Sequence, residues 1–384
     1  MTSRPYKLQV AQSQIDDLHR RLQTVRLPDE PIGIDPWESG TSLTWIRRLT
    51  AYWRDSFDWR AQEARLNSWP QYTVDIGPNT IHYLHVHGYG PNPMPLLLLH
   101  GWPGSVFEFL DIIPLLSDPG SHGGDPSDAF TLVIPSLPGF GPSFVPGQPR
   151  CSIERMADCF TTLMCNELGY AHFGAQGGDW GASVAARLGH AYPEQVTGIH
   201  LNLLPLPRST DAIETPTQQD KDYISTLERW LYAETGYSLI QGTRPQTLAY
   251  ALADSPTGLA AWITEKFRAW SDCGGDIERS FTLDTLLADV SLYWFTNCAG
   301  ASFWPYFARH NHGWPFPLEA GVGVPTGYAE FPAEIIRPPR SLAEKTFTRI
   351  TRWTSMPRGG HFAALEQPQA LAREVQAFFR PLRQ

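Results

Sequence analysis

The segment that decides the fold is "AHFGAQGGDWGASVAARLGH", residues 171–190. It begins with the pattern of a short buried strand and continues with the pattern of a helix, and Asp179 lies between the two among three glycines. A sharp strand-to-helix elbow holds its central residue in a strained conformation and needs small neighbours. We predict that the Asp179 side chain projects at the carboxyl end of a sheet, beside a helix N-terminus that favours an anion. The alternative is that Asp179 only caps the helix.

Aspartate at this elbow predicts a particular kind of chemistry. A carboxylate is ionised at neutral pH, so it can attack without the help of a base. Attack on an sp3 carbon by serine would leave an ether, which water does not readily cleave. Attack by a carboxylate leaves an ester, which water cleaves at the carbonyl carbon. The elbow therefore favours displacement at the carbon of an epoxide or an alkyl halide over hydrolysis of esters or amides.

Strand and helix patterns alternate on both sides of the elbow. Apolar runs typical of buried parallel strands end in turns rich in glycine and proline. They are "TIHYLHVHG", "PLLLLHG", "FTLVIPSLPGFG", "VTGIHLNLLP", "GVPTGYAEFP" and "FTRITRWTSMP", and a helix pattern, "PQALAREVQAFFRPL", follows them at the end of the chain. This alternation predicts an α/β fold with a mostly parallel central sheet.

Two other regions divide the chain into parts. Residues 1–75 contain helix patterns unlike the rest, so we predict an N-terminal extension that packs on the core. Residues 207–319 are mostly helical and interrupt the alternation, which predicts a lid over the ligand-binding edge of the sheet. Residues 76–206 and 320–384 are then the two parts of the core.

Composition and charge exclude several classes of function. The 384 residues carry a net charge of −9 and no basic cluster suited to nucleic acid or anionic lipid. The start of the chain lacks the apolar core of a signal peptide, and the longest apolar run is too short for a membrane span, so we expect a soluble cytoplasmic protein. Five cysteines without CxxC spacing predict reduced thiols. No cluster of histidine, cysteine and carboxylate residues suggests a metal site, and we predict no metal and no cofactor.

An ester on Asp179 needs a base to activate water and an acid to orient that base. In α/β hydrolases the order along the chain is nucleophile, acid, histidine. His361 follows a Gly-Gly turn in "MPRGGHFAALEQP", and Glu334 follows the preceding strand in "VPTGYAEFPAE". Both positions are at the carboxyl ends of predicted strands, so we predict His361 as the base and Glu334 as the acid. Glu330 remains an alternative acid.

The oxyanion formed when water attacks the ester needs hydrogen-bond donors. The stretch "LLLLHGWPG", residues 96–104, continues directly from a buried strand into a turn. We predict that the backbone N–H groups of Trp102 and Trp180 form a two-donor oxyanion hole. The alternative is an ordinary turn of glycine and proline.

Taken together, these segments resemble the microsomal-type epoxide hydrolases of the α/β-hydrolase superfamily. The resemblance covers nearly the whole chain and includes "HGWPGS", "GGDWGA", "ETGYSLIQGTRPQT", "DSPTGLAAWITEKF", "VPTGYAEFPAE" and "RGGHFAALEQP". It implies the α/β-hydrolase fold with a helical lid, and conversion of an epoxide and water to a vicinal diol. It also implies that two lid tyrosines bind the epoxide oxygen. Tyr237 and Tyr306 match by position, with Tyr232 and Tyr293 as alternatives.

Several questions stay open at this point. A haloalkane dehalogenase shares the aspartate nucleophile and often the following tryptophan, and a non-catalytic scaffold that binds a small molecule is a second alternative. A serine hydrolase would need Ser183, which we expect to point away from the elbow. The aromatic residues favour a bulky or aryl epoxide, in detoxification or in natural-product biosynthesis. Membrane-bound members carry an N-terminal anchor that is not found here, so we expect no membrane partner, and a homodimer is one alternative for the oligomeric state.

Overall fold

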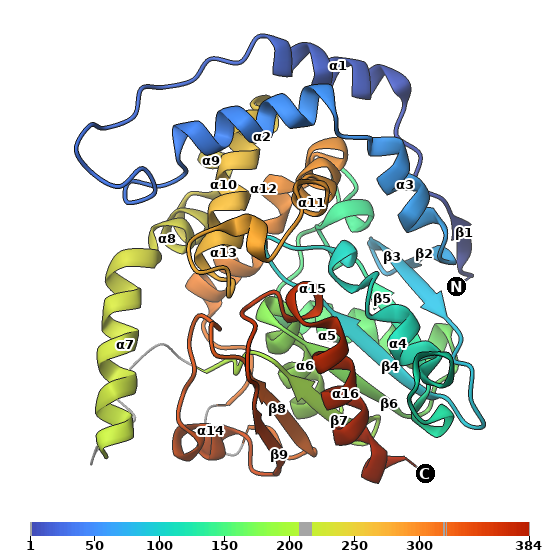
Figure 1. The fold of residues 1–384 in the computed structure, drawn as a ribbon. Helices are drawn as coiled ribbons and strands as arrows, with labels where there is room; N and C mark the ends of the chain where they lie inside the picture. The colour runs from blue at the N-terminus through green and yellow to red at the C-terminus, as the bar shows by residue number, and fades with distance from the viewer. Residues whose placement is uncertain (1, 207–216, 318, 320, 384) are drawn as a thin grey trace.

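A nine-stranded sheet runs through the described part of the chain, residues 2–206, 217–317, 319 and 321–383 of the computed structural model (Figure 1). The strand order is β1-β2-β3-β5-β4-β6-β7-β8-β9, and pairing is parallel from β5 onward. The strands are β1 (Arg4–Tyr6), β2 (Gln71–Ile76), β3 (Asn79–Val86), β4 (Met94–Leu99), β5 (Phe130–Pro135), β6 (Phe173–Gly177), β7 (Val196–Leu201), β8 (Thr326–Glu330) and β9 (Ile350–Ser355). The predicted α/β fold with a mostly parallel sheet is therefore confirmed.

The core of the sheet is made by the apolar runs that the sequence contains. All side chains of β5 and the last four of β4 are buried, as expected where helices cover both faces of parallel strands. The helices of the core are α4 (Ile113–Ser117), α5 (Ile153–Thr161), α6 (Asp179–Ala191), α14 (Arg340–Thr346), α15 (Ala363–Glu366) and α16 (Pro368–Phe379). The carboxyl ends of the parallel strands then meet at one edge of the sheet, where a site can be built.

Two short strands were not predicted. β1 and β2 pair antiparallel at one edge of the sheet, and β2 forms a hairpin with β3. β1 has only three residues, too few for a periodic pattern, and the alternation in β2 is short.

The helical segment after residue 42 is two helices, α2 (Leu43–Asp55) and α3 (Trp59–Asn67), because the Asp58 carboxylate accepts the backbone N–H of Ala61 and starts a new helix.

The N-terminal helices pack against the helices of the predicted lid and not only beside the sheet. Figure 1 shows α1 (Gln12–Gln23) and α2 above α9 to α12. The Tyr52 hydroxyl donates to Asp284 at 2.8 Å, and the Thr41 hydroxyl donates to the backbone oxygen of Ala261 at 2.9 Å. The helices within the segment predicted as a lid are α7 (Gln218–Glu234), α8 (Gly236–Thr243), α9 (Pro245–Asp254), α10 (Pro256–Ala269), α11 (Leu283–Thr296), α12 (Ala299–Ser302) and α13 (Trp304–His312).

We retain the division into an extension (1–75), a lid (207–319) and a core in two parts (76–206 and 320–384) as a proposal. Residues 207–216, where the proposed lid begins, lie outside the described residues. Within the described ranges, the helices are all too short or too polar to cross a membrane.

Candidate active site

Asp179 sits at a strained elbow between β6 and α6. Its φ angle is +46°, in the left-handed region that side chains other than glycine rarely adopt. Such a conformation costs about 1–3 kcal/mol and persists only where the surroundings enforce it. The surroundings here are tight, because a Cβ at Gly181 would lie 2.1 Å from the Leu99 backbone oxygen. The predicted elbow and its need for small neighbours are thus both present.

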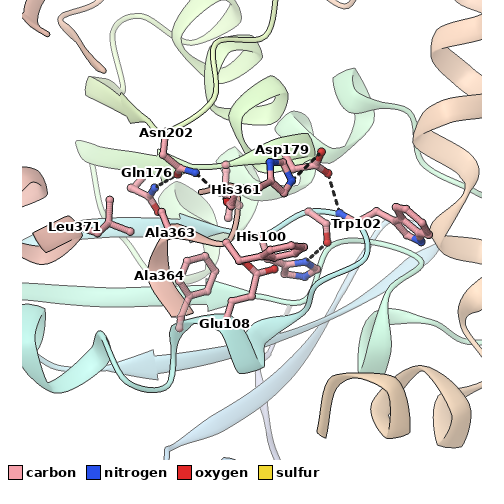
Figure 2. A pocket seen from close by; sticks show the side chains of 15 residues that line it. His100, Trp102, Glu108, Gln176, Asp179, Asn202, His361, Ala363, Ala364 and Leu371 are labelled. Atoms are coloured by element: carbon pink, nitrogen blue, oxygen red, sulfur yellow. Dashed lines mark hydrogen bonds and ion pairs between the residues drawn. The ribbon is translucent and has the colours of Figure 1, made fainter. Parts of the chain in front are cut away.

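The two carboxylate oxygens of Asp179 have different neighbours (Figure 2). Oδ1 accepts the backbone N–H of Trp102 at 2.8 Å, whereas Oδ2 lies 3.6 Å from Nε2 of His361. Trp102 belongs to the turn after β4, so the turn predicted as half of an oxyanion hole does contact the aspartate. Trp180, the second predicted donor residue, is the next residue in the first turn of α6 and is buried.

His100 fixes the turn that presents Trp102. Its Nε2 accepts the backbone N–H of Leu137 at 3.1 Å, so its Nδ1 carries the proton that is donated to the Gly101 oxygen at 3.0 Å. Burial lowers the pKa of His100 to about 4, against the opposing effect of the hydrogen bond to Gly101. This histidine is therefore neutral at physiological pH, and its two hydrogen bonds hold the turn in place.

His361 and Glu334 form a buried pair beside Asp179. Nδ1 of His361 lies 2.6 Å from Oε1 of Glu334, and that same oxygen also accepts the backbone N–H of Ile335 at 2.7 Å. Oε2 of Glu334 is buried and has no hydrogen-bond partner in the described part of the chain. The backbone N–H of His361 donates to the Trp270 oxygen at 2.9 Å, which ties the base to the end of α10.

The electrostatics of this cluster favour a protonated histidine in the resting state. Burial alone would lower the pKa of His361, but the charges of Glu334, Asp179 and Glu108 outweigh it and raise the pKa to about 9. At neutral pH a histidine with this pKa is protonated and cannot accept a further proton.

Three further polar residues line the cavity around His361 and were not predicted: Glu108, Gln176 and Asn202. Asn202 donates to the His361 backbone oxygen at 3.5 Å and accepts from the Gln176 amide at 2.9 Å. Burial, followed by the charge of Asp289, raises the pKa of Glu108 well above its usual range, and Asp179 adds to this while His361 opposes it. Glu108 follows "HGWPGS" by only three residues, which is the signal that could have identified it.

The two predicted lid tyrosines lie on the other side of Asp179. Tyr237 in α8 and Tyr306 in α13 line one pocket together with Asp179 and Trp180. The Tyr237 ring stacks on Trp102 with centroids 5.3 Å apart and meets the Tyr306 ring edge-on at 5.7 Å. The Tyr306 hydroxyl is buried without a well-formed hydrogen bond to any described residue. Burial, the Tyr237 hydroxyl and the Asp179 charge raise the pKa of Tyr306 well above its usual range.

Different contacts surround the residues considered as alternatives for the lid tyrosines and the acid, which are Tyr232, Tyr293 and Glu330. Tyr232 is 96% exposed, and the Tyr293 hydroxyl donates to the Gly104 backbone oxygen at 2.9 Å. Glu330 accepts from the Ser355 hydroxyl at 2.9 Å, away from His361.

The expectation that Ser183 points away from the elbow is wrong. It lies four residues after Asp179 on α6, on the same helical face, and lines the same pocket.

The remaining walls of this pocket are mostly apolar. They include residues 203–206, Tyr223, Trp314 and Ile336, together with the half-buried cation Arg309, which lies over the rings of Trp180 and Trp314. Among the described residues, no three histidine, cysteine or carboxylate side chains are grouped so as to hold a metal ion. The pocket suits a mainly apolar ligand with one polar end directed at the tyrosines.

Comparisons with known proteins show which family the chain is similar to. A family model described as "Epoxide hydrolase N terminus" matches residues 3–109, and one described as "alpha/beta hydrolase fold" matches residues 94–243. A Stigmatella aurantiaca protein named "Putative epoxide hydrolase" is 43% identical over 99% of this chain and 85% of its own length. "Epoxide hydrolase 1" of Oryctolagus cuniculus is 37% identical over 98% of this chain and 88% of its own.

Solved structures show the same similarity. The epoxide hydrolase of Aspergillus niger aligns with a TM-score of 0.87 and 29% identity, covering 100% of this chain and 97% of that one. The juvenile hormone epoxide hydrolase of Bombyx mori aligns with a TM-score of 0.89 and 28% identity, covering 99% and 95%. With relatives named epoxide hydrolase at 43% and 37% identity over nearly its whole length, the chain belongs to the epoxide hydrolase family of the α/β-hydrolase fold.

Proposed function

We propose that the chain hydrolyses an epoxide to a vicinal diol through a covalent ester on Asp179. The observation that carries this proposal is the position of Asp179 between two cavities. One contains the hydroxyl-bearing rings of Tyr237 and Tyr306, and the other contains His361. A nucleophile with acids on its substrate side and a base on its other side suits two successive steps.

In the first step the epoxide oxygen binds to the hydroxyl groups of Tyr237 and Tyr306. Oδ2 of Asp179 attacks a ring carbon from the side opposite the carbon–oxygen bond, which breaks as the new carbon–Oδ2 bond forms. An alkoxide is a poor leaving group, so a tyrosine donates its proton as the ring opens. Burial, which raises the pKa of Tyr306, ensures that its phenol still carries that proton at neutral pH.

In the second step the ester is hydrolysed. Ester formation neutralises Asp179, which removes one of the charges that keep His361 protonated. The proton released by His361 restores the tyrosine, and neutral His361 then accepts a proton from water, with Glu334 balancing the charge. The water oxygen attacks the Asp179 carboxyl carbon, and the bond to Oδ2 breaks, so the diol leaves with Oδ2 and the proton from His361. The second proton of the water remains on the new Asp179 carboxyl group and passes to His361, which restores the resting carboxylate and imidazolium.

The oxyanion of this second step forms on Oδ1. In the resting protein this atom already accepts the Trp102 N–H at 2.8 Å, and the Trp180 N–H would be the second donor. These steps need no metal and no organic cofactor. The apolar and aromatic walls of the pocket support a bulky or aryl epoxide as substrate. A cytoplasmic location and a homodimer stay predictions.

Labelled water in a single turnover tests the covalent route. With enzyme in excess over epoxide in 18O water, the diol should contain unlabelled oxygen from Asp179, and the label should enter the carboxylate. Label that appears in the diol directly would exclude the ester. His361→Gln should form the ester but fail to hydrolyse it, so intact-protein mass should increase by the mass of the substrate.

Haloalkane dehalogenation is the second candidate, favoured by one observation: the Trp180 indole Nε1 is buried without a hydrogen-bond partner among the described residues, as a halide donor would be. Halide release and diol formation should be measured on an alkyl halide and an epoxide of matched shape. Binding of both without turnover would instead support a non-catalytic scaffold.

A further inference from the structure

The segment "AAWITEKF", residues 260–267, belongs to the motifs behind the family resemblance but has no part in the chemistry described above. It lies in α10 and contains Lys266, whose exposed fraction is only 7%. Lysine is rarely buried to this extent unless its charge has partners. The partners of Lys266 therefore indicate why it is there.

The ammonium group of Lys266 contacts two carboxylates and two aromatic rings. Its Nζ lies 2.7 Å from Glu265 and 3.4 Å from Glu234. It also lies over the Tyr237 ring, 4.8 Å from the centroid, and 5.6 Å from the centroid of Trp270. A desolvated cation over an aromatic ring is held by the negative potential of the ring face.

Lys266 links α10 to α8 through the Tyr237 ring. A second link is the Trp262 indole N–H, which donates to the Gln241 side chain at 2.9 Å. Trp262 and Lys266 are four residues apart on α10, and Tyr237 and Gln241 are four residues apart on α8, so each pair shares a helix face. Both contacts hold α8 against α10, but only the contact at Tyr237 includes a charged group, the Lys266 ammonium.

We propose that Lys266 is a positioning residue for epoxide ring opening, which holds the Tyr237 ring and stabilises the negative charge that develops on its oxygen as it donates to the alkoxide. This inference rests on the proposed function. Negative charge is absent from the phenol in the ground state and builds up as the ring opens, so a fixed cation beside the ring acts more strongly in the transition state than in the ground state. Glu265 and Glu234 hold the ammonium group in place and weaken its field in part, but Lys266 is the charge that lies over the face of the Tyr237 ring.

The test uses two epoxides of nearly equal size. It compares how strongly the rate of ring opening depends on proton donation by Tyr237. The alkoxide from 3,3,3-trifluoro-1,2-epoxypropane is less basic than that from 1,2-epoxypropane and needs less help from the tyrosine. The ester formed in single turnovers is followed by mass spectrometry of acid-quenched protein. Variants are Lys266→Met, Lys266→Arg and, as matched control, Trp262→Phe, which removes the uncharged cross-link. Lys266→Gln is the second neutral variant if Lys266→Met does not fold.

We expect the neutral Lys266 variants to form the ester about tenfold more slowly with 1,2-epoxypropane. The loss should be clearly smaller with the trifluoro substrate, and Lys266→Arg should restore both rates. Trp262→Phe should slow both substrates by the same factor or neither. The inference is overturned if the neutral variants slow both substrates equally, or neither, while wild-type protein forms the ester. Wild-type protein that forms no ester with these two epoxides or with a larger aryl epoxide would instead overturn the proposed function.

Discussion

Loss of the charge on Asp179 should lower the pKa of His361, so that its imidazole becomes neutral at neutral pH. This change can be measured without substrate. Asp179→Asn removes the charge as ester formation would, but leaves a side chain of almost the same shape. In the wild-type protein, burial disfavours the charged imidazole, and the charges of Glu334, Asp179 and Glu108 raise its pKa to about 9. We predict that the pKa of His361 falls in the variant, because one of the stabilising charges is gone and burial is unchanged.

The size of the fall follows from the distance. Nε2 of His361 lies 3.6 Å from Oδ2 of Asp179, and both side chains are largely buried. Two unit charges at this distance attract by about 4–5 kcal/mol at an effective dielectric constant of about 20. That corresponds to about three pKa units, so the variant should titrate near pH 6. A base with this pKa is neutral and active at pH 7, whereas the resting base is not.

NMR titration of the His361 ring, with isotope-labelled histidine, measures both values directly. Asp179→Ala serves as a second charge-free variant, since it lacks the amide group that asparagine would place near the ring. The pH dependence of ester hydrolysis in wild-type protein should then follow the lower value. If the pKa in both variants stays within about one unit of the wild-type value, the Asp179 charge does not control the base and the proposed order of events is refuted.

The further predictions concern four single substitutions. Glu334→Gln should reduce turnover roughly 10²–10⁴-fold, because the imidazolium loses its buried counter-charge. Glu330→Gln should leave turnover unchanged, and steady-state kinetics on both variants would reveal a wrong assignment of the acid. Tyr306→Phe should slow ester formation about 10²-fold in single turnovers but keep the melting temperature, because its buried hydroxyl has no well-formed hydrogen bond to lose among the described residues. Gly181→Ala should destabilise the fold by about 1–3 kcal/mol, seen as a lower melting temperature, because the new methyl group would collide with the Leu99 backbone.

Local sequence patterns were sufficient to predict those parts of the site whose residues are close together in the chain. An elbow needs small residues within a few positions of Asp179, and the turns before Trp102 and His361 each follow a strand with a clear apolar pattern. The order of these strands along the chain then places their ends at one edge. That is why the closest partners of Asp179 could be predicted before any distance was known.

Features that depend on contacts between distant segments could not be predicted in the same way. The sheet order, in which β5 lies between β3 and β4, leaves no periodic signal in the sequence. Asn202 reaches the His361 backbone across 159 positions of the chain. Lys266 appears in the sequence as an ordinary charged residue of a helix, and only packing shows that its ammonium group is buried against Tyr237.

The contact between α2 and the lid has a consequence for how the chain is made. The side of α2 that carries Trp45, Leu49 and Trp53 is buried in the finished protein, where α2 lies against α10 and α11. During synthesis, however, 200 residues separate Asp55, the end of α2, from Pro256, the start of α10. Helix α1, which also contacts α2, is made earlier, but at about 5–20 residues per second the part of this surface that α10 and α11 cover stays exposed for roughly 10–40 seconds. The same contact that holds the lid in place therefore makes the unfinished chain a target for chaperones and a risk for aggregation.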